Sequence, residues 1–158
     1  MALELSTGTF ESTLDEKGRV VIPSCLRSRY AGDLIITQGK HNCAWILTPD
    51  AYFHFKERME QKAEEMSGDE YEWLQYQYII PAKVVEIDQK SGRIPVPAAT
   101  RTYAHLVKDC LVLSAGDHLE IWDSQTFYNH LAENRSRIRE ATNKLGAQIF
   151  SPNQEAGE

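Results

Sequence analysis

The sequence has few of the features that mark membrane, secreted or zinc-binding proteins. Its longest apolar run, Cys43–Leu47, is far shorter than the ~20 residues that a membrane helix needs. The first residues carry no basic segment followed by a long apolar core, so we expect no secretory signal peptide. The 3 cysteines are scattered and have no CxxC spacing. We therefore expect reduced, buried thiols in a cytoplasmic protein that has no membrane contact.

Signatures of catalysis are equally scarce. None of the 5 histidines has the HxxxH spacing of a helical metal site, and neither GxxxxGK[ST] nor GxGxxG occurs. Asp15 and Asp88 each have a lysine and an arginine within five positions. These cations would hold both carboxylates ionised and unsuited to donating a proton. We expect no catalytic residue, no metal ion, no cofactor and no small-molecule substrate.

An excess of positive charge is also missing, because the formal net charge is −6. The charges are nevertheless unevenly distributed along the chain. Residues 15–40 carry five Lys or Arg against three Asp or Glu, and residues 83–108 carry five against two. Residues 50–76 carry three against eight. Two locally basic segments therefore lie within an acidic protein, and these segments are the ones to test for an anionic partner.

The two basic segments contain related copies of one stretch. The first copy, LDEKGRVVIP, spans residues 14–23, and the second, IDQKSGRIPVP, spans residues 87–97. With one gap opposite Ser91, the copies match at Asp, Lys, Gly, Arg, Pro and a second arginine, which is Arg27 in the first copy and Arg101 in the second. The duplication indicates that the chain is built from two equivalent halves.

Each copy predicts the same local structure. A short strand leads into a tight turn in which Gly18 or Gly92 supplies a positive φ, and a β-branched strand follows. A proline then opens a short helix, expected over 23–30 and again over 97–106. Turn chemistry requires the Asp and the Gly but does not require cations at repeated positions. The added Ser91 should either bulge the second turn or re-aim the side chains beyond it, so that they no longer match those of the first turn.

Two interpretations account for the repeated cations. Lys and Arg on a hairpin can reach phosphates, and Arg can make a bidentate contact with guanine, which favours binding to double-stranded DNA. Alternatively, an internal Asp–Arg salt bridge merely closes each hairpin. The candidates for DNA contact are Lys17, Arg19, Lys90 and Arg93, and the residues expected to shape the two loops are Asp15, Gly18, Asp88 and Gly92.

The order of the expected elements is the same in both halves and predicts an α+β fold with a mainly β core. Neither half of roughly 70 residues would bury much core alone, so we expect the halves to pack about a pseudo-two-fold axis as one β-barrel-like unit. Short helices accompany the strands, and a longer C-terminal helix should turn Phe127, Leu131, Ile138 and Leu145 inward. The expected parts are a first repeat at 8–54, a helical connector at 55–82, a second repeat at 83–126, and the helix with a disordered tail at 127–158.

The two D-x-x-G-R-x-x-x-P-like blocks resemble the swapped-hairpin SpoVT/AbrB superfamily. The duplication resembles the MraZ family of bacterial transcriptional regulators in particular, and so do Cys43–Trp45 and the block GDHLEIWD at 116–123. The resemblance runs from about Gly8 to Trp122 and onto the last helix. It implies a swapped-hairpin fold and a nucleoid-associated regulator that represses the division and cell-wall gene cluster. It also implies a ring-shaped homo-oligomer that binds tandem direct repeats upstream of that cluster.

By position, the resemblance assigns DNA contact to Lys17, Arg19, Lys90 and Arg93, and loop shaping to Asp15 and Asp88. Two positions depart from the family's pattern: Ser91 lengthens the second block, and Tyr76 stands where an arginine is expected. Two alternatives remain, an AbrB-like antitoxin and a structural oligomer whose turns seal subunit contacts. An antitoxin would use a long tail, whereas only eight residues run from Ser151 to Glu158.

Overall fold

A computed structural model describes residues 7–151 of the chain. By its internal contacts the chain divides after Ser124 into two compact units, which are described separately. The disordered tail expected at the C-terminus lies largely outside the described residues.

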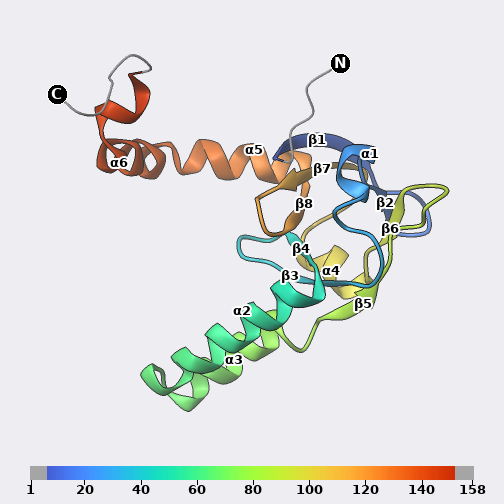
Figure 1. The fold of residues 1–158 in the computed structure, drawn as a ribbon, viewed down its shortest axis with the longest axis horizontal. Helices are drawn as coiled ribbons and strands as arrows, with labels where there is room; N and C mark the ends of the chain where they lie inside the picture. Colours follow the sequence, from blue (N-terminus) through green and yellow to red (C-terminus); the bar gives the residue numbers. More distant parts are fainter. Residues whose placement is uncertain (1–6, 152–158) are drawn as a thin grey trace. The chain divides into compact units, whose positions relative to one another are not determined.

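The first unit is built on a six-stranded antiparallel sheet with the strand order β1-β7-β8-β4-β3-β5 (Figure 1). Strand β1 pairs with β7 and β5 pairs with β3, so each half of the chain adds an edge strand to the hairpin of the other half. Strands β4 and β8 pair at the centre. The bounds are Gly8–Thr13 for β1, Leu34–Gln38 for β3, Ala44–Leu47 for β4, Lys83–Val85 for β5, Asp109–Ser114 for β7 and Leu119–Asp123 for β8.

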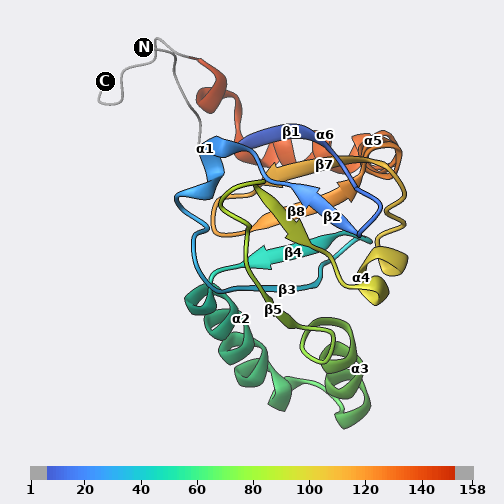
Figure 2. The same cartoon turned by 90° about the vertical axis from the view of Figure 1, so that its right-hand side faces the viewer.

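A second, two-stranded sheet pairs β2 (Arg19–Val21) with β6 (Arg93–Pro95). Figure 2 shows these strands side by side across one face of the larger sheet. Val20 and Ile94 face each other in the register and are both fully buried. Burying such a side chain is worth roughly 1.5–3 kcal/mol, so this pair anchors the two turns to the core.

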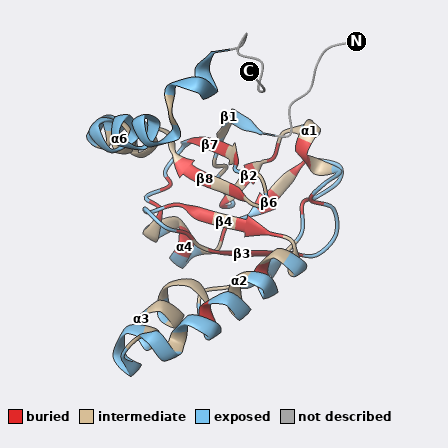
Figure 3. Cartoon of the chain, turned by 60° about the vertical axis from the view of Figure 1, so that its left-hand side comes forward, coloured by how far each residue is buried: buried red, intermediate tan, exposed pale blue. Residues whose placement is uncertain are grey.

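The main core gathers apolar side chains from both sheets, and Figure 3 shows the buried positions concentrated on the strands. Leu34, Ile36, Ile46 and Ile121 of the larger sheet belong to this cluster. Strands β1 and β5 are the two edges of the larger sheet, and no pairing among residues 7–151 joins them. The α+β class with a mainly β core is as predicted, whereas closure into a barrel is not detected.

Two short helices follow prolines, as the sequence predicts, but they end earlier than expected. Helix α1 covers Ser24–Arg27 and α4 covers Ala98–Tyr103. Pro23 and Pro97 precede them with φ values of −54° and −56°, close to the value that the pyrrolidine ring imposes.

Helices α2 (Pro49–Lys62) and α3 (Gly68–Tyr78) connect the two halves, with a short 3-10 turn, η1 (Ala63–Glu65), between them. The Thr48 hydroxyl caps α2 by accepting the Ala51 N–H at 3.3 Å. Ser67 and Glu70 form a reciprocal capping box at the start of α3. A hydroxyl residue followed by proline, and a serine followed three residues later by glutamate, are start signals that the local sequence carries.

The turn between β7 and β8 holds a histidine between two carboxylates. His118 Nδ1 lies 2.8 Å from Asp117 Oδ1, and its Nε2 lies 2.8 Å from Glu120 Oε2. The hydrogen bond to Glu120 is the main cause that raises the pKa of His118, and burial opposes it. The imidazole packs against Trp45, whose other contacts include a stacked ring of Tyr78 at 5.5 Å. The cluster therefore joins the β7–β8 hairpin to the end of α3.

The second unit contains α5 (Ser124–Glu133), which begins at the unit boundary, α6 (Arg135–Leu145) and the 3-10 turn η2 (Ala147–Phe150). The single long helix expected here is interrupted at Asn134, whose side-chain amide donates to the His130 carbonyl at 2.8 Å. A short amide side chain that bonds locally in this way competes with the helix ladder. The inward orientation expected for Ile138 and Leu145 is wrong, because their exposed fractions are 41% and 58%.

No helix in the described part of the chain is both long enough and apolar enough to cross a bilayer.

Candidate nucleic-acid interface

The two repeated turns close with the same outer hydrogen bond. The Asp15 N–H donates to the Arg19 carbonyl, and the Asp88 N–H donates to the Arg93 carbonyl, both at 2.8 Å. Arg19 is the first residue of β2 and Arg93 is the first residue of β6. The backbones of the two arginines therefore occupy equivalent positions in the two turns. The expectation that the second turn's extra residue displaces Arg93 from that place is wrong for the backbone.

The extra residue is taken up inside the second turn. In the first turn the Gly18 N–H donates to the Asp15 carbonyl at 3.0 Å, three residues back. In the second turn the Gly92 N–H donates to the Asp88 carbonyl at 2.7 Å, four residues back. Gly18 and Gly92 have φ values of +77° and +70°, as their place in a tight turn predicts. Of the two expected outcomes, the bulged turn is therefore the observed one.

Asp15 organises the first turn through both of its carboxylate oxygens. Oδ1 accepts the backbone N–H groups of Lys17 and Arg19, each at 2.9 Å. Oδ2 accepts the side-chain Nε–H of Arg19 at 2.9 Å. The Arg19 backbone N–H is the main cause that lowers the pKa of Asp15, and the Arg19 guanidinium adds to it. The carboxylate is thus held ionised and fixes both the main chain and the side chain of Arg19.

Asp88 organises the backbone of the second turn but pairs with no guanidinium within the described residues. Its Oδ1 accepts the N–H groups of Lys90 at 2.8 Å and Ser91 at 3.3 Å. The Lys90 N–H is the main cause that lowers the pKa of Asp88. Each aspartate therefore accepts two backbone N–H groups of its own turn, but only Asp15 accepts that of its arginine, because the Arg93 N–H donates to the Ser91 hydroxyl at 3.4 Å.

The side chain of Arg93 reaches the aspartate of the other turn. Its Nε lies 3.4 Å from Asp15 Oδ2, the same oxygen that holds Arg19. Both arginine side chains remain about one-third exposed, at 34% for Arg19 and 37% for Arg93. Beside them lies a groove of about 460 Å³, lined by Arg19, Arg93, Pro95 and the segment 86–89. One carboxylate thus brings together two arginines that are 74 positions apart (93 − 19).

This geometry determines which part of each guanidinium stays available. Both arginines face Asp15 through Nε, and no hydrogen bond to another described residue occupies their Nη groups. The terminal fork of an arginine is the part that makes bidentate contacts with guanine or phosphate. Lys17 and Lys90 are exposed within the turns, as a phosphate contact would require. The salt bridge that the structural interpretation expects in each hairpin is present in the first turn, between Asp15 and Arg19, whereas Arg93 of the second turn pairs with Asp15 instead of Asp88. Both interpretations are compatible with these contacts.

Sequence reasoning did not assign a role to Arg27 and Arg101, the second arginine of each copy. Each guanidinium lies against the turn glycine of the opposite half: Arg101 against Gly18 and Arg27 against Gly92. Their recurrence in the aligned copies was the available signal. Tyr76, where an arginine is expected, is exposed on α3, and its hydroxyl donates to Glu72 at 2.8 Å.

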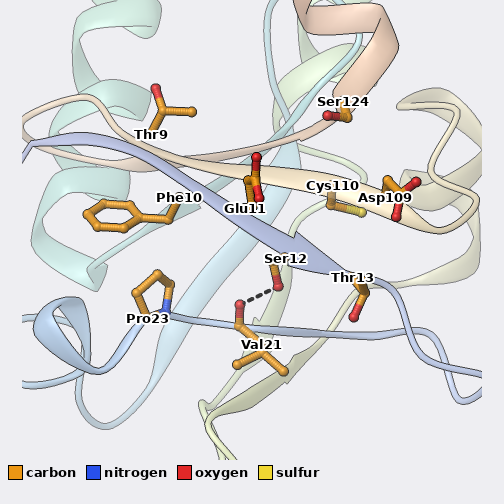
Figure 4. A pocket seen from close by; sticks show the side chains of 10 residues that line it. All are labelled: Thr9, Phe10, Glu11, Ser12, Thr13, Val21, Pro23, Asp109, Cys110 and Ser124. Atoms are coloured by element: carbon orange, nitrogen blue, oxygen red, sulfur yellow. Dashed lines mark hydrogen bonds between the residues drawn. The ribbon is translucent and has the colours of Figure 1, made fainter.

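A larger groove of about 880 Å³ runs along β1 (Figure 4). Ser12 and Val21 both line this groove, and the Ser12 hydroxyl donates a hydrogen bond to the Val21 carbonyl at 2.8 Å. The thiol of Cys110 lines this groove, and its burial raises its pKa to about 11. A thiol with so little thiolate at neutral pH is a poor nucleophile. Among the described residues no group of three His, Cys, Asp or Glu side chains could hold a metal ion.

Comparison with known proteins shows a family likeness over nearly the whole chain. The family model described as "MraZ protein, putative antitoxin-like" matches twice, over residues 5–72 and 79–146. A protein of Treponema denticola named "Transcriptional regulator MraZ" is 36% identical over 141 residues, which cover 89% of this chain and 96% of that protein. Proteins of the same name from Thermobifida fusca and Leifsonia xyli are 33% and 31% identical, over 87% and 90% of this chain and 94% and 98% of their own lengths.

Proposed function

The chain belongs to the MraZ protein family, and from this premise we propose that it is a transcriptional regulator that binds double-stranded DNA through its two β-turns. The DNA-contacting residues are Lys17, Arg19, Lys90 and Arg93. Asp15, Gly18, Asp88 and Gly92 shape the turns. The role is non-enzymatic and places the protein in the cytoplasm, on the nucleoid.

The observation that carries this proposal is the shared carboxylate of Asp15. It faces Arg19 and Arg93 through Nε and leaves both terminal forks without a hydrogen bond to the described residues. A guanidinium held in this way has lost part of its rotamer freedom before it meets DNA, which lowers the cost of binding. A bidentate contact with guanine contributes roughly 1–3 kcal/mol of discrimination.

The acidity of the protein requires several turns to act together. The four candidate cations are balanced by nearby Asp15, Glu16, Glu86 and Asp88, and the whole chain carries −6. One protomer would therefore gain little from phosphate attraction. We infer a ring-shaped homo-oligomer that presents copies of the turns to tandem direct repeats, because later contacts then become intramolecular. The family assignment supports the division and cell-wall gene cluster as the repressed target.

A duplicated swapped-hairpin architecture is part of the same proposal. The double match of the family model supports it, and so does the strand pairing, in which β1 joins β7, β5 joins β3 and β2 joins β6. If each strand is replaced by its counterpart in the other half (β1 by β5, β2 by β6, β3 by β7), the same three pairings result. The two arginines would then stand about a pseudo-two-fold axis that passes between β2 and β6.

Two other functions remain to be tested against this one. The description of the family as antitoxin-like favours an antitoxin, which would bind a partner protein as well as DNA. The Asp15–Arg19 salt bridge favours a structural oligomer whose turns do not meet DNA. Co-purification of a stoichiometric partner protein would identify an antitoxin. Oligomers without affinity for DNA would identify a structural role.

The test is to sequence the genomic DNA that cross-links to the full-length protein in cells. The wild type should enrich a few sites that contain direct repeats, and the Arg19→Ala/Arg93→Ala variant should lose this enrichment. The matched control is Arg137→Ala/Arg139→Ala, which removes two exposed arginines from α6 and should retain it. Equal enrichment by both variants would overturn the proposed role of the turns.

A further inference from the structure

Arg27 of α1 and Arg101 of α4 are separated by the same 74 positions (101 − 27) as the arginines of the turns. Each donates a hydrogen bond from its guanidinium to a backbone carbonyl of its own half. Arg27 donates through Nε to the Ile22 carbonyl at 2.8 Å, and Arg101 donates through Nη1 to the Val96 carbonyl at 2.6 Å. In both cases the acceptor lies five residues earlier, so each guanidinium is held at a fixed place beside the strand that leads into its helix.

From that place each guanidinium extends to the turn of the opposite half. A Cβ built on Gly18 would collide with the guanidinium of Arg101, and a Cβ built on Gly92 would collide with that of Arg27. Both glycines are buried and have positive φ. The missing side chains of the two turn glycines thus make room for the two arginines.

A backbone hydrogen bond accompanies each of these contacts. The Val96 N–H donates to the Gly18 carbonyl at 2.9 Å, and the Ile22 N–H donates to the Gly92 carbonyl at 2.8 Å. The residue on which each arginine is anchored is therefore also the residue that bonds the opposite turn. Arginine, anchor carbonyl and turn glycine form one unit, and this unit occurs twice.

We propose that Arg27 and Arg101 are positioning residues that act across the two halves: Arg101 sets the geometry of the first turn, and Arg27 sets that of the second. Each guanidinium fills the space beside a turn glycine that a side chain at that position would otherwise occupy. Loss of Arg101 should loosen the backbone of the first turn, from Asp15 to Arg19, and leave the backbone of the second turn, from Asp88 to Arg93, unchanged. Loss of Arg27 should have the reverse effect. The connection to DNA rests on the proposed function, but the effect on the turns does not.

The first experiment needs no DNA. Amide hydrogen exchange and ¹H–¹⁵N shifts are recorded for Gly18 and Gly92 in the full-length protein, in Arg101→Ala and in Arg27→Ala. Because a net hydrogen bond contributes about 0.5–1.5 kcal/mol, exchange at the affected glycine should rise roughly 2- to 13-fold. The Arg101 variant should show this rise at Gly18 and the Arg27 variant at Gly92. Effects on the turn of the same half, on both turns equally or on neither would overturn the proposal.

Two further variants guard against general loss of structure. Arg101→Lys retains the charge but lacks the planar fork, so it should reproduce the pattern at Gly18 even if Arg101→Ala does not fold. Arg29→Ala removes an exposed arginine just beyond α1 and should change neither glycine. A lysine variant with wild-type exchange at Gly18 would show that charge alone suffices, which contradicts the packing role.

The second experiment measures coupling on DNA. Lys17 and Lys90 report on the first and second turns, and each is combined with Arg101→Ala in a double-mutant cycle. The affinity losses from Arg101→Ala and Lys17→Ala should not be additive, whereas those from Arg101→Ala and Lys90→Ala should be. Absence of DNA binding in every variant and in the wild type would remove the proposed function and leave the exchange result standing. Normal DNA binding with the opposite coupling pattern would remove only the positioning role.

Discussion

Arg93 Nε lies 3.4 Å from Oδ2 of Asp15, a carboxylate that belongs to the other turn and lies 78 positions earlier in the chain (93 − 15). The same oxygen accepts a hydrogen bond from Arg19 at 2.9 Å. The two turns consequently share one acidic centre, although each has an aspartate of its own.

This asymmetry predicts different effects for two matched substitutions. Asp15→Asn removes the charge that forms a salt bridge with both arginines. Asp88→Asn removes a charge that forms a salt bridge with neither, although both arginines help to lower the pKa of Asp88. Asp15→Asn should lower the ratio of operator affinity to random-DNA affinity by about 5- to 160-fold, because loss of one bidentate contact costs roughly 1–3 kcal/mol. Asp88→Asn should retain most of the ratio. Fluorescence anisotropy titrations with operator and random duplexes measure this affinity ratio. Equal losses of the ratio in the two variants would contradict a special role for Asp15.

The two arginines should also differ from each other. Asp15 holds Arg19 by its backbone N–H and its Nε at 2.9 Å, while Arg93 has the single, longer approach of 3.4 Å. Since base readout requires a defined arginine geometry and phosphate contact tolerates variation, Arg19→Ala should abolish discrimination between operator and random DNA. Arg93→Ala should weaken binding to both about equally.

Binding titrations of these two variants on both duplexes decide the assignment. Each should keep the wild-type oligomer and melting temperature, because both side chains are partly exposed. Discrimination that survives in Arg19→Ala and disappears in Arg93→Ala would mean that the roles of the halves are reversed.

A lone protomer should bind DNA weakly. One or two arginine contacts of ~1–3 kcal/mol cannot offset an association cost of ~4–15 kcal/mol. Assembly into an oligomer should increase the affinity for tandem repeats spaced by one helical turn by about 10²–10⁴-fold. Sedimentation with single-repeat and tandem-repeat duplexes tests this, and a monomer that binds a single repeat as tightly as a tandem array would refute it.

The His118 cluster predicts a pH dependence of stability. Glu120 and Asp117 raise the folded-state pKa of His118 above its ordinary value of 6.5. Protonated His118 therefore stabilises the fold below pH 6.5, and this contribution is lost as the pH rises through the raised pKa. Burial is the largest cause acting on Glu120 and raises its pKa, but the hydrogen bonds from His118 and Trp122 and the charge of His118 together hold the pKa below 4.5. The stability that ionised Glu120 contributes is therefore lost at acidic pH.

The difference in melting temperature between wild type and His118→Gln should accordingly be larger at pH 6 than at pH 8.5. Each kcal/mol corresponds to about 2–4 °C for a chain of this size. His54→Gln, which removes an exposed histidine from α2, is the control and should follow the wild type. A difference that grows with rising pH would contradict the cluster as described.

The features that could be predicted from the sequence are the local ones. The two turns, the positive φ of Gly18 and Gly92 and the proline-initiated helices follow from short-range sterics that are visible in each copy of the repeat. The break at Asn134 was missed because helical periodicity continues across it. There the local bond from the Asn134 amide prevails over the apolar pattern.

Contacts between the halves could not be predicted in the same way. Aligning the copies pairs Asp15 with Arg19 and Asp88 with Arg93, yet Arg93 reaches Asp15. The repeat also marks Arg101 as important without indicating that it packs on Gly18 of the first half. Such partners are set by the exchange of strands between halves, which sequence spacing does not encode.

The most direct test of the proposed DNA contact is a salt titration of binding to a duplex recovered from the bound genomic sites. The logarithm of the affinity should fall linearly with the logarithm of the salt concentration, because phosphate contacts release counterions. In the Lys17→Ala/Lys90→Ala variant the slope should be shallower by about one for each lysine that contacts a phosphate, with the oligomer unchanged. A wild-type protein that binds no duplex at low salt, or a variant with an unaltered slope, would contradict DNA contact by these turns.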